Sequence, residues 1–452
     1  MKTPIADFVQ QYITSDMTRF HMPGHKGHVF FGCEPYDITE ISGADVLHHG
    51  DGIIKESERF ASQLFGSGAT FYSTEGSTLC VKSMLAILCM ERRKSDESSY
   101  ILAARNVHRS MIDACALLNL DVHFLPVTEK TSLCSCVVQA KELDTVLRQE
   151  EKKPLGVYIT SPDYLGQIAD VRSLSKVCQK WDIPLLVDNA HGAYLHFLKE
   201  PIHPMDLGAA MCSDSAHKTL PVLTGGAYLH IHPDYVERFA PYAEQAMTLF
   251  GSTSPSYLIM QSLDLCNAYL KRQYCEHLQE LIVKIEQKKR YYCGQGIPIT
   301  ASEPLKIVVH AMQNGYSGEQ IAQELRTFEI ECEYADDQSV VLMATPENTE
   351  KDWERLDQWA LHSMLRKKRS ISLTEKQSVV ANGERVMSIR EAVFSASEEI
   401  PVIEAEGRVC AAETVACPPA IPIAVSGERI NRQMIEQFLA YGIDTVPVVR
   451  KV

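Results

Sequence analysis

The sequence lacks the segments that would carry a chain into or across a membrane. Its first residues, Met1 to Asp7, hold no apolar signal core, and no later run approaches the roughly 18 uncharged residues that a membrane span needs. Internal repeats and low-complexity tracts are absent as well. With 45% hydrophobic and 23% charged residues, the composition is that of an ordinary globular protein. We therefore expect a cytoplasmic protein whose 452 residues divide into two or three domains.

The chain has fewer basic than acidic residues. The chain has 44 Lys and Arg against 58 Asp and Glu, which gives a net charge of −14. Proteins that bind nucleic acid neutralise phosphates with Lys and Arg, so this balance argues against a nucleic-acid partner. The same negative field favours the encounter with cationic small molecules.

Cysteine pairs at metal-ligand spacing are scarce. The 14 cysteines are scattered singly except for Cys134 and Cys136, and no second pair follows at the spacing of a zinc site. We interpret the cysteines as small apolar core residues in a reducing compartment. Zinc at Cys134 and Cys136 is the alternative.

Histidines at positions 21, 25 and 28 also suggest a metal, but Pro23-Gly24 breaks any helix that would place them on one face. We interpret this segment as a shaped loop near a bound anion, and we expect no metal site.

The sequence does contain a regular alternation of apolar strands and helices. Continuous apolar runs predict buried strands at residues 100–103, 122–126, 155–160, 185–188, 209–212 and 226–231, with helical patterns in most of the intervals. This alternation predicts an α/β fold with a mainly parallel sheet covered on both faces. A second alternating region, with strands at 305–310 and 340–344 and a helix at 317–328, predicts a smaller α+β domain.

Polar residues follow several of these strands, where ligands of parallel sheets bind. Gly76-Ser77-Thr78 opens a helix and offers backbone amides, two hydroxyls and the positive end of the helix dipole to a phosphate. A simple N-cap by Ser77 or Thr78 is the alternative. Asp188 ends the strand 185–188, where a carboxylate could pair with a pyridine nitrogen and keep it protonated. A helix cap or a surface charge is the alternative there.

Lys218 stands in the stretch Ser215-Ala216-His217-Lys218, after the strand at 209–212. A lysine shielded from water beside a cationic group becomes nucleophilic near neutral pH and can condense with an aldehyde, of which pyridoxal phosphate is the obvious candidate. Taken alone, Lys218 could be a solvated surface residue. The order of phosphate seat, strand-end acid and lysine on one α/β domain favours the joint interpretation.

At this point the sequence resembles the fold-type-I, pyridoxal-phosphate-dependent ornithine/lysine/arginine decarboxylases of bacteria. The resemblance covers almost the whole chain and is carried by eight motifs in order, at residues 20–27 (Phe-His-Met-Pro-Gly-His-Lys-Gly), 45–49, 76–78, 188–193, 215–221, 253–257, 303–306 and the proline-rich 417–427. It implies an aspartate-aminotransferase-like domain that uses pyridoxal 5'-phosphate to decarboxylate a basic L-amino acid (arginine, lysine or ornithine) to its amine in polyamine metabolism.

The resemblance also implies roles for individual residues. Lys218 would bind the cofactor covalently, Asp188 would pair with the ring nitrogen, His191 would support the ring substituents, and His108 would stack on the ring. The phosphate would be held by Gly76, Ser77, Thr78, Ser215 and His217. Thr253 would reach the phosphate of a neighbouring subunit, which implies a homodimer.

The family pattern is not followed everywhere. Glu75 places a charge beside the expected phosphate, and Ala420 replaces a usual glycine. The chain begins almost directly at the His-Met-Pro-Gly loop and so resembles the short branch that lacks a receiver-like N-terminal domain. We expect an N-terminal arm and loop (1–42), a cofactor-binding large domain (43–290), a small α+β domain (291–375) and a C-terminal decarboxylase-type domain (376–452).

Some questions stay open at this level. Acidic residues are needed for the distal cation of the substrate, and Glu331, Glu333 and Asp336 are candidates, although each could be a surface residue. Another reaction on the same cofactor, such as an aminotransferase or aldolase-type lyase, is one alternative function. A non-catalytic regulatory relative is the other, and the presence of Lys218 and Asp188 argues against it.

Overall fold

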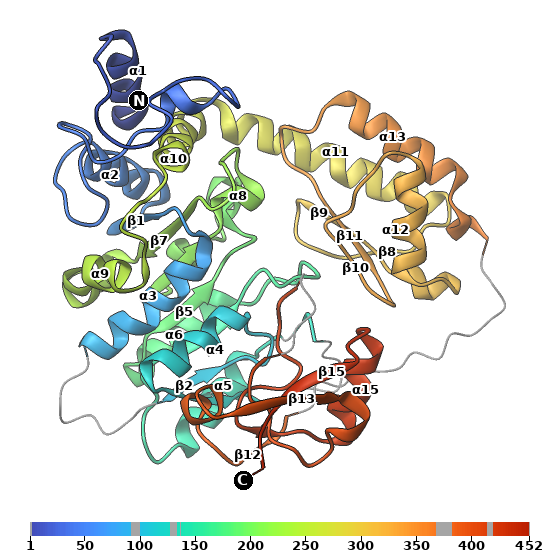
Figure 1. Ribbon diagram of the computed structural model, residues 1–452. Coiled ribbons are helices and arrows are strands. Elements are labelled where there is room, and N and C mark those ends of the chain that lie inside the picture. Colours follow the sequence, from blue (N-terminus) through green and yellow to red (C-terminus); the bar gives the residue numbers. More distant parts are fainter. Residues whose placement is uncertain are drawn as a thin grey trace. The chain divides into compact units, whose positions relative to one another are not determined.

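The computed structural model describes residues 2–91, 100–126, 133–135, 137–367, 382–413 and 419–451 (Figure 1). The chain forms two compact units, and neither is continuous in sequence. The first unit comprises Met1–Leu102, Leu143–Ser161 and Asp170–Glu276. The second comprises Ala103–Glu142, Pro162–Ala169 and His277–Val452.

A twisted sheet forms the centre of the first unit. Its strands are adjacent in the order β1 (Ala69–Ser73), β7 (Ala227–Ile231), β6 (Met211–Asp214), β5 (Leu185–Asp188), β4 (Val157–Thr160) and β2 (Tyr100–Ala103). β4, β5 and β6 run parallel, whereas β7 is antiparallel to both β6 and β1. Every residue of β2, β5, β6 and β7 is buried, as expected for strands covered on both faces. The predicted mainly parallel sheet is therefore confirmed.

One predicted strand is displaced along the chain. The apolar run at 209–212 predicts the strand there, but β6 spans Met211–Asp214. Its register with β5 pairs Leu186 with Met211 and Asp188 with Ser213, so the ladder continues into polar residues. The hydropathy pattern predicted the end of this strand too early, because Ser213 and Asp214 are polar and yet fully buried.

Helices surround this sheet. They are α1 (Pro4–Thr14), α2 (Ile53–Phe65), α3 (Gly76–Glu91), α5 (Ala140–Gln149), α6 (Val171–Trp181), α7 (Pro204–Leu207), α8 (Ala216–Thr219), α9 (Val236–Phe250) and α10 (Tyr257–Tyr269). α3 is apolar around most of its circumference and packs against α9 (Figure 1). α2 ends at Gly66, whose φ of 61° is the left-handed conformation of a helix C-cap.

The second unit is α+β, and the strands and helix predicted between residues 305 and 344 lie within it. It holds β3 (Asp121–Phe124), α4 (Arg109–Leu118), α11 (Cys275–Gly294), α12 (Gly318–Thr327) and α13 (Glu350–His362). An antiparallel sheet has the order β10 (Tyr334–Ala335), β11 (Val340–Met343), β9 (Lys306–Val309) and β8 (Ile299–Thr300). The C-terminal part adds two short sheets, β12 (Glu384–Arg385) with β14 (Glu428–Arg429) and β13 (Ser397–Pro401) with β15 (Thr445–Val449), and helices α14 (Ile389–Val393) and α15 (Arg432–Ala440).

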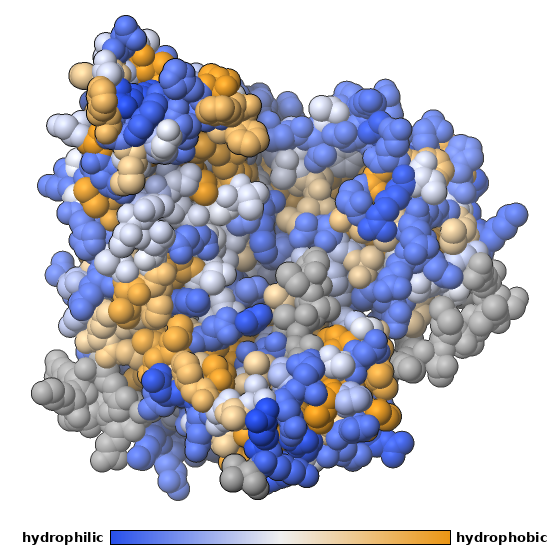
Figure 2. All heavy atoms as spheres, viewed as in Figure 1, coloured by the Kyte–Doolittle hydropathy of each residue, from blue (hydrophilic) through white to orange (hydrophobic). Residues whose placement is uncertain are grey.

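Apolar side chains are exposed on the N-terminal segment of the first unit. Phe20 and Phe31 are 94% and 95% exposed, and Met22, Val29 and Phe30 are also exposed. Orange atoms gather over this segment at the upper left of Figure 2. Within the described ranges, no helix combines the length and apolar character that crossing a membrane requires.

Candidate active site

Residues that are predicted to hold a phosphate meet where α3 begins. The Ser215 hydroxyl donates to the Ser77 hydroxyl at 2.8 Å, which joins two residues 138 positions apart. Gly76 has a φ of 69°, its N–H donates to the Gly225 carbonyl at 2.7 Å, and a Cβ there would meet no atom within 4 Å. Two hydroxyls and an uncrowded glycine therefore lie together at the N-terminus of a 16-residue helix, whose dipole attracts anions.

Lys218 lies on α8, directly after β6. Its Nζ is 3.1 Å from Nε2 of His191, within hydrogen-bonding distance. Nδ1 of the neighbouring His217 is 3.1 Å from the Gly226 carbonyl. A carbonyl only accepts, so Nδ1 of His217 carries a proton.

Asp188 is a buried carboxylate at the end of β5. One oxygen accepts from the Tyr158 hydroxyl and the other from the Ala190 N–H, both at 3.2 Å. Asp188 begins a short turn that also carries His191 and is closed by a bond from the Gly192 N–H to the Asn189 carbonyl at 2.7 Å. The strand-end acid and the histidine that contacts Lys218 thus belong to one turn.

Of the other predicted site residues, Thr78 lies next to Ser77, whereas Thr253 and His108 lie in other segments. Thr78 is in the first turn of α3, and Thr253 is exposed in the loop after α9. His108 belongs to the second unit, where its ring accepts from the Ser110 N–H at 3.1 Å and caps α4. Its role in stacking stays a prediction.

Glu75 has a structural explanation. Its carboxylate accepts a hydrogen bond from the Ser252 N–H at 2.6 Å, so it tethers the loop that carries Thr253. Ala420 adopts a φ of 56°, and its carbonyl accepts from the Arg109 N–H at 2.9 Å. The backbone thus keeps the left-handed conformation that a glycine adopts more easily.

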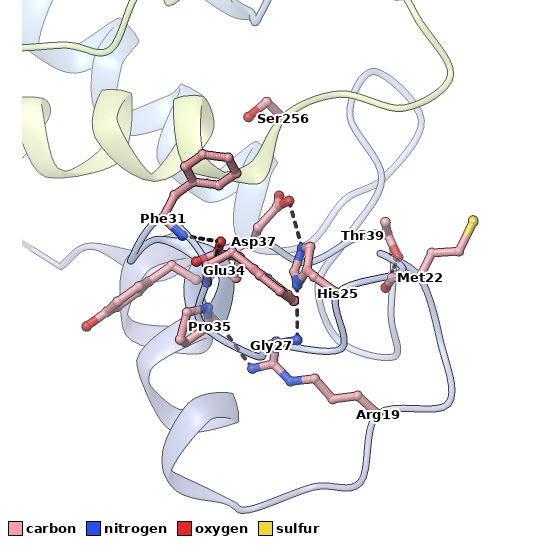
Figure 3. A network of polar contacts seen from close by, with 12 residues as sticks. Arg19, Met22, His25, Gly27, Phe31, Glu34, Pro35, Asp37, Thr39 and Ser256 are labelled. Atoms are coloured by element: carbon pink, nitrogen blue, oxygen red, sulfur yellow. Dashed lines mark hydrogen bonds and ion pairs between the residues drawn. The ribbon is translucent and has the colours of Figure 1, made fainter.

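The loop that contains His21, His25 and His28 is held by polar contacts among residues of the N-terminal segment (Figure 3). His25 lies 3.2 Å from the Asp37 carboxylate and accepts from the Gly27 N–H, and Arg19 donates to the Pro35 carbonyl. Burial would raise the pKa of Glu34, but N–H groups of residues 30–32 lower that pKa to about 2. The predicted anion contact of this loop stays a prediction.

One other sequence interpretation concerns a metal, the zinc alternative at Cys134 and Cys136. Cys134 is buried, 3.5 Å from the Tyr334 hydroxyl, whereas Cys136 lies outside the described residues, as do Cys417 and Pro418 of the proline-rich motif. Among the described side chains, one group could offer three ligand atoms to an ion: His203, Asp214 and His230.

Sequence reasoning missed three polar residues around this site: Tyr158, Asn189 and Asp214. Asp214 lies beyond the predicted end of its strand, and the one sequence signal for it was its place immediately before Ser215. Tyr158 and Asn189 gave no such signal, since their partners depend on how strands align.

A mainly parallel α/β sheet with a strand-end carboxylate, a hydroxyl-lined helix N-terminus and a lysine beside an imidazole defines a fold-type-I pyridoxal phosphate enzyme. The open, hydroxyl-lined space at Gly76 fits the phosphate of this cofactor, and Asp188 has the chemistry to pair with its ring nitrogen. The chain belongs to the Orn/Lys/Arg decarboxylase family: the model of the major domain matches residues 3–310, and that of the C-terminal domain matches residues 374–444.

Full-length relatives agree with this assignment. Uncharacterized protein YaaO of Bacillus subtilis is 30% identical, over 97% of this chain and 94% of its own. Arginine decarboxylase of the same organism is 28% identical, over 96% and 92%. Among solved structures, lysine decarboxylase A from Pseudomonas aeruginosa superposes with a TM-score of 0.81 at 16% identity, covering 99% of this chain and 80% of that one, which shows the shared fold. This chain is a decarboxylase of basic amino acids, and its cofactor is pyridoxal phosphate.

Proposed function

We propose that the preferred substrate is L-arginine and the product agmatine. The supporting observation is the extent of similarity: arginine decarboxylases of Bacillus subtilis and Bacillus anthracis are each 28% identical over 96% of this chain. The constitutive lysine decarboxylase of Escherichia coli is 23% identical over 59%. Lysine and ornithine are the alternative substrates.

The proposed roles follow the site geometry. Lys218 would bind the cofactor covalently, with Asp188 on the ring nitrogen and Ser77, Thr78, Ser215 and His217 around the phosphate. When bound, pyridoxal phosphate supplies the electron sink for loss of the α-carboxylate as CO₂. His191, 3.1 Å from the Lys218 amine, would hold or exchange a proton with it.

For the distal cation we propose Glu333. Glu333 and Glu331 both line a cavity of about 260 Å³ in the second unit, and Glu333 accepts from the Tyr164 hydroxyl at 2.8 Å. Glu331 is paired with Arg326. The carboxylate of Asp336 accepts from the Tyr334 hydroxyl and from the N–H groups of residues 338 and 339. These contacts make Glu333 the better candidate of the three.

We also infer a homodimer in the cytoplasm that serves polyamine synthesis. The exposed apolar segment around Phe20 and Phe31 and the exposed Thr253 support a partner subunit at this surface. No disulfide joins the cysteines of the described ranges, which fits a reducing compartment.

The test is direct. Purified protein is incubated with pyridoxal phosphate and, separately, with L-arginine, L-lysine and L-ornithine, while CO₂ and the amine are measured. We expect agmatine as the main product, and no product from Lys218→Ala. Cadaverine or putrescine as the main product would refute the choice of arginine. CO₂ from none of the three would refute the whole assignment.

A further inference from the structure

A buried polar cluster lies beneath the candidate site of the first unit. Asp214 is the last residue of β6, and its Oδ1 accepts from Asn189 Nδ2 at 2.7 Å. Its Oδ2 accepts from His203 Nε2 at 2.9 Å and lies 3.4 Å from His230 Nε2. All four side chains are fully buried. A group of this kind is costly to bury, so its retention calls for an explanation.

The hydrogen bonds assign a charge to Asp214. Nδ1 of His203 accepts from the Met205 N–H at 3.3 Å, so the ring proton is on Nε2, which donates to Asp214. Burial by itself would raise the pKa of Asp214, but His203 and His230 hold that pKa well below its usual range. Asp214 is therefore a buried carboxylate anion.

The same protonation argues against a metal ion in this cluster. A histidine binds a metal through a nitrogen lone pair and donates its other N–H to an acceptor. Here Nδ1 of His203 meets a backbone donor, and Nε2 carries the proton. The cluster is a hydrogen-bonded network around one negative charge.

This network is connected to the turn that carries Asp188 and His191. Asn189 donates its backbone N–H to the Ser213 carbonyl at 2.9 Å and its side-chain amide to Asp214. Gly192 leaves room for the Asn189 side chain, since a Cβ at this position would lie 2.1 Å from Asn189 Oδ1. Asn189 thus holds the turn to β6 through two hydrogen bonds, one of which goes to the charged carboxylate of Asp214.

Asp214 is also next to the phosphate seat. Ser215 follows it directly and donates to Ser77 at 2.8 Å. The Asp214 carboxylate therefore connects the ends of β5 and β6. The end of β5 carries the candidate partner of the cofactor ring, and the end of β6 leads into a candidate partner of its phosphate.

We propose that Asp214 is a positioning residue: by holding Asn189, its carboxylate fixes the turn of Asp188 and His191 and thereby sets the affinity for pyridoxal phosphate. The proposal rests on the cofactor site and is independent of which basic amino acid is decarboxylated.

The test compares Asp214→Asn, Asn189→Ala and the double variant with the wild type. The dissociation constant of pyridoxal phosphate is measured by absorbance titration without substrate, and the thermal midpoint of each apo protein is recorded. We expect each single variant to weaken cofactor binding about tenfold, because a hydrogen bond to a charged group is lost. The double variant should bind about as weakly as the single ones, because both break the same contact. The visible circular dichroism of the bound cofactor should change, since the ring is held differently.

The control is Asp264→Asn, which alters another buried carboxylate of the first unit, one that accepts from the Ile5 and Ala6 N–H groups. It should lower the thermal midpoint and leave cofactor affinity unchanged. Wild-type affinity in both Asp214→Asn and Asn189→Ala would overturn the proposal, as would equal weakening in Asp264→Asn. If Asp214→Asn does not fold, Asn189→Ala decides. A wild-type protein that binds no pyridoxal phosphate would instead refute the cofactor assignment itself.

Discussion

At the scale of single residues, the contact between Lys218 and His191 carries the most chemistry. The two nitrogens lie 3.1 Å apart although α7 and β6 separate them along the chain, so the imidazole is placed to exchange a proton with the amine. We expect His191→Gln to lower kcat about 100-fold, within the range typical of general acid–base groups. Steady-state kinetics with saturating cofactor measures this. A variant within threefold of wild-type kcat would remove His191 from proton transfer.

Glu333 makes a prediction about specificity. If it binds the distal cation, Glu333→Gln should raise KM for the preferred substrate about tenfold and leave kcat nearly unchanged, since the contact is the same in ground and transition states. Glu331→Gln is the matched control, because Glu331 is already paired with Arg326. Equal effects of the two substitutions would contradict the assignment.

Ala420 tests the cost of a departure from the family pattern. A residue with a Cβ pays about 1–2 kcal/mol in the left-handed region, whereas glycine adds about 0.5–1 kcal/mol of chain entropy to the unfolded state. We expect Ala420→Gly to stabilise the protein by about 0.5–1 kcal/mol in denaturant unfolding. Ala114→Gly, inside α4, should destabilise it.

At the scale of elements, α2 contains a carboxylate that favours the protonated form. Burial raises the pKa of Glu58 to about 7, against the opposing effects of Lys55 and the Tyr72 N–H. Because the folded-state pKa is raised, the folded protein binds the proton more tightly than the unfolded chain. The stability from this group is therefore present below about pH 4.5 and is lost as the pH rises to about 7.

This contribution of Glu58 to the free energy of unfolding is on the order of 3 kcal/mol, which follows from the difference between its pKa in the folded and the unfolded state. Glu58→Gln should remove it, so that the free energy of unfolding falls less than in the wild type between pH 5 and pH 8. Urea unfolding at several pH values measures the difference, with Glu56→Gln on the same helix as control. Parallel pH profiles for wild type and Glu58→Gln would refute the buried acid as the cause.

At the scale of the whole molecule, the proposed dimer makes the active site a shared property. If Thr253 serves the phosphate site of the partner subunit, each active site takes Lys218 from one subunit and Thr253 from the other. A dimer of one Thr253→Ala subunit and one Lys218→Ala subunit then keeps one intact site. Mixing the two inactive variants after mild dissociation should restore about a quarter of the wild-type activity, as expected for random pairing of subunits. Light scattering checks the dimer mass. A monomer, or mixtures without activity, would contradict the shared site.

Much of the large sheet was predictable from local pattern. The strands at 100–103 and 185–188 have the predicted limits, because runs of buried apolar residues identify strands covered on both faces. The end of β6 was not predictable, since its pairing with β5 continues through Ser213 and Asp214. The four-part division at residues 42, 290 and 375 and the role of His108 stay predictions.

The sequence by itself determined the α/β class and the family, and it predicted the lysine, the strand-end acid and the hydroxyls for the phosphate, because each depends on a short stretch of chain. Tertiary structure alone decided which of these side chains meet: Ser77 with Ser215, Lys218 with His191, and Asn189 with the buried charge of Asp214. The physical reason is that strand order and register bring distant residues together, and the protonation of a buried acid depends on the neighbours that this packing supplies.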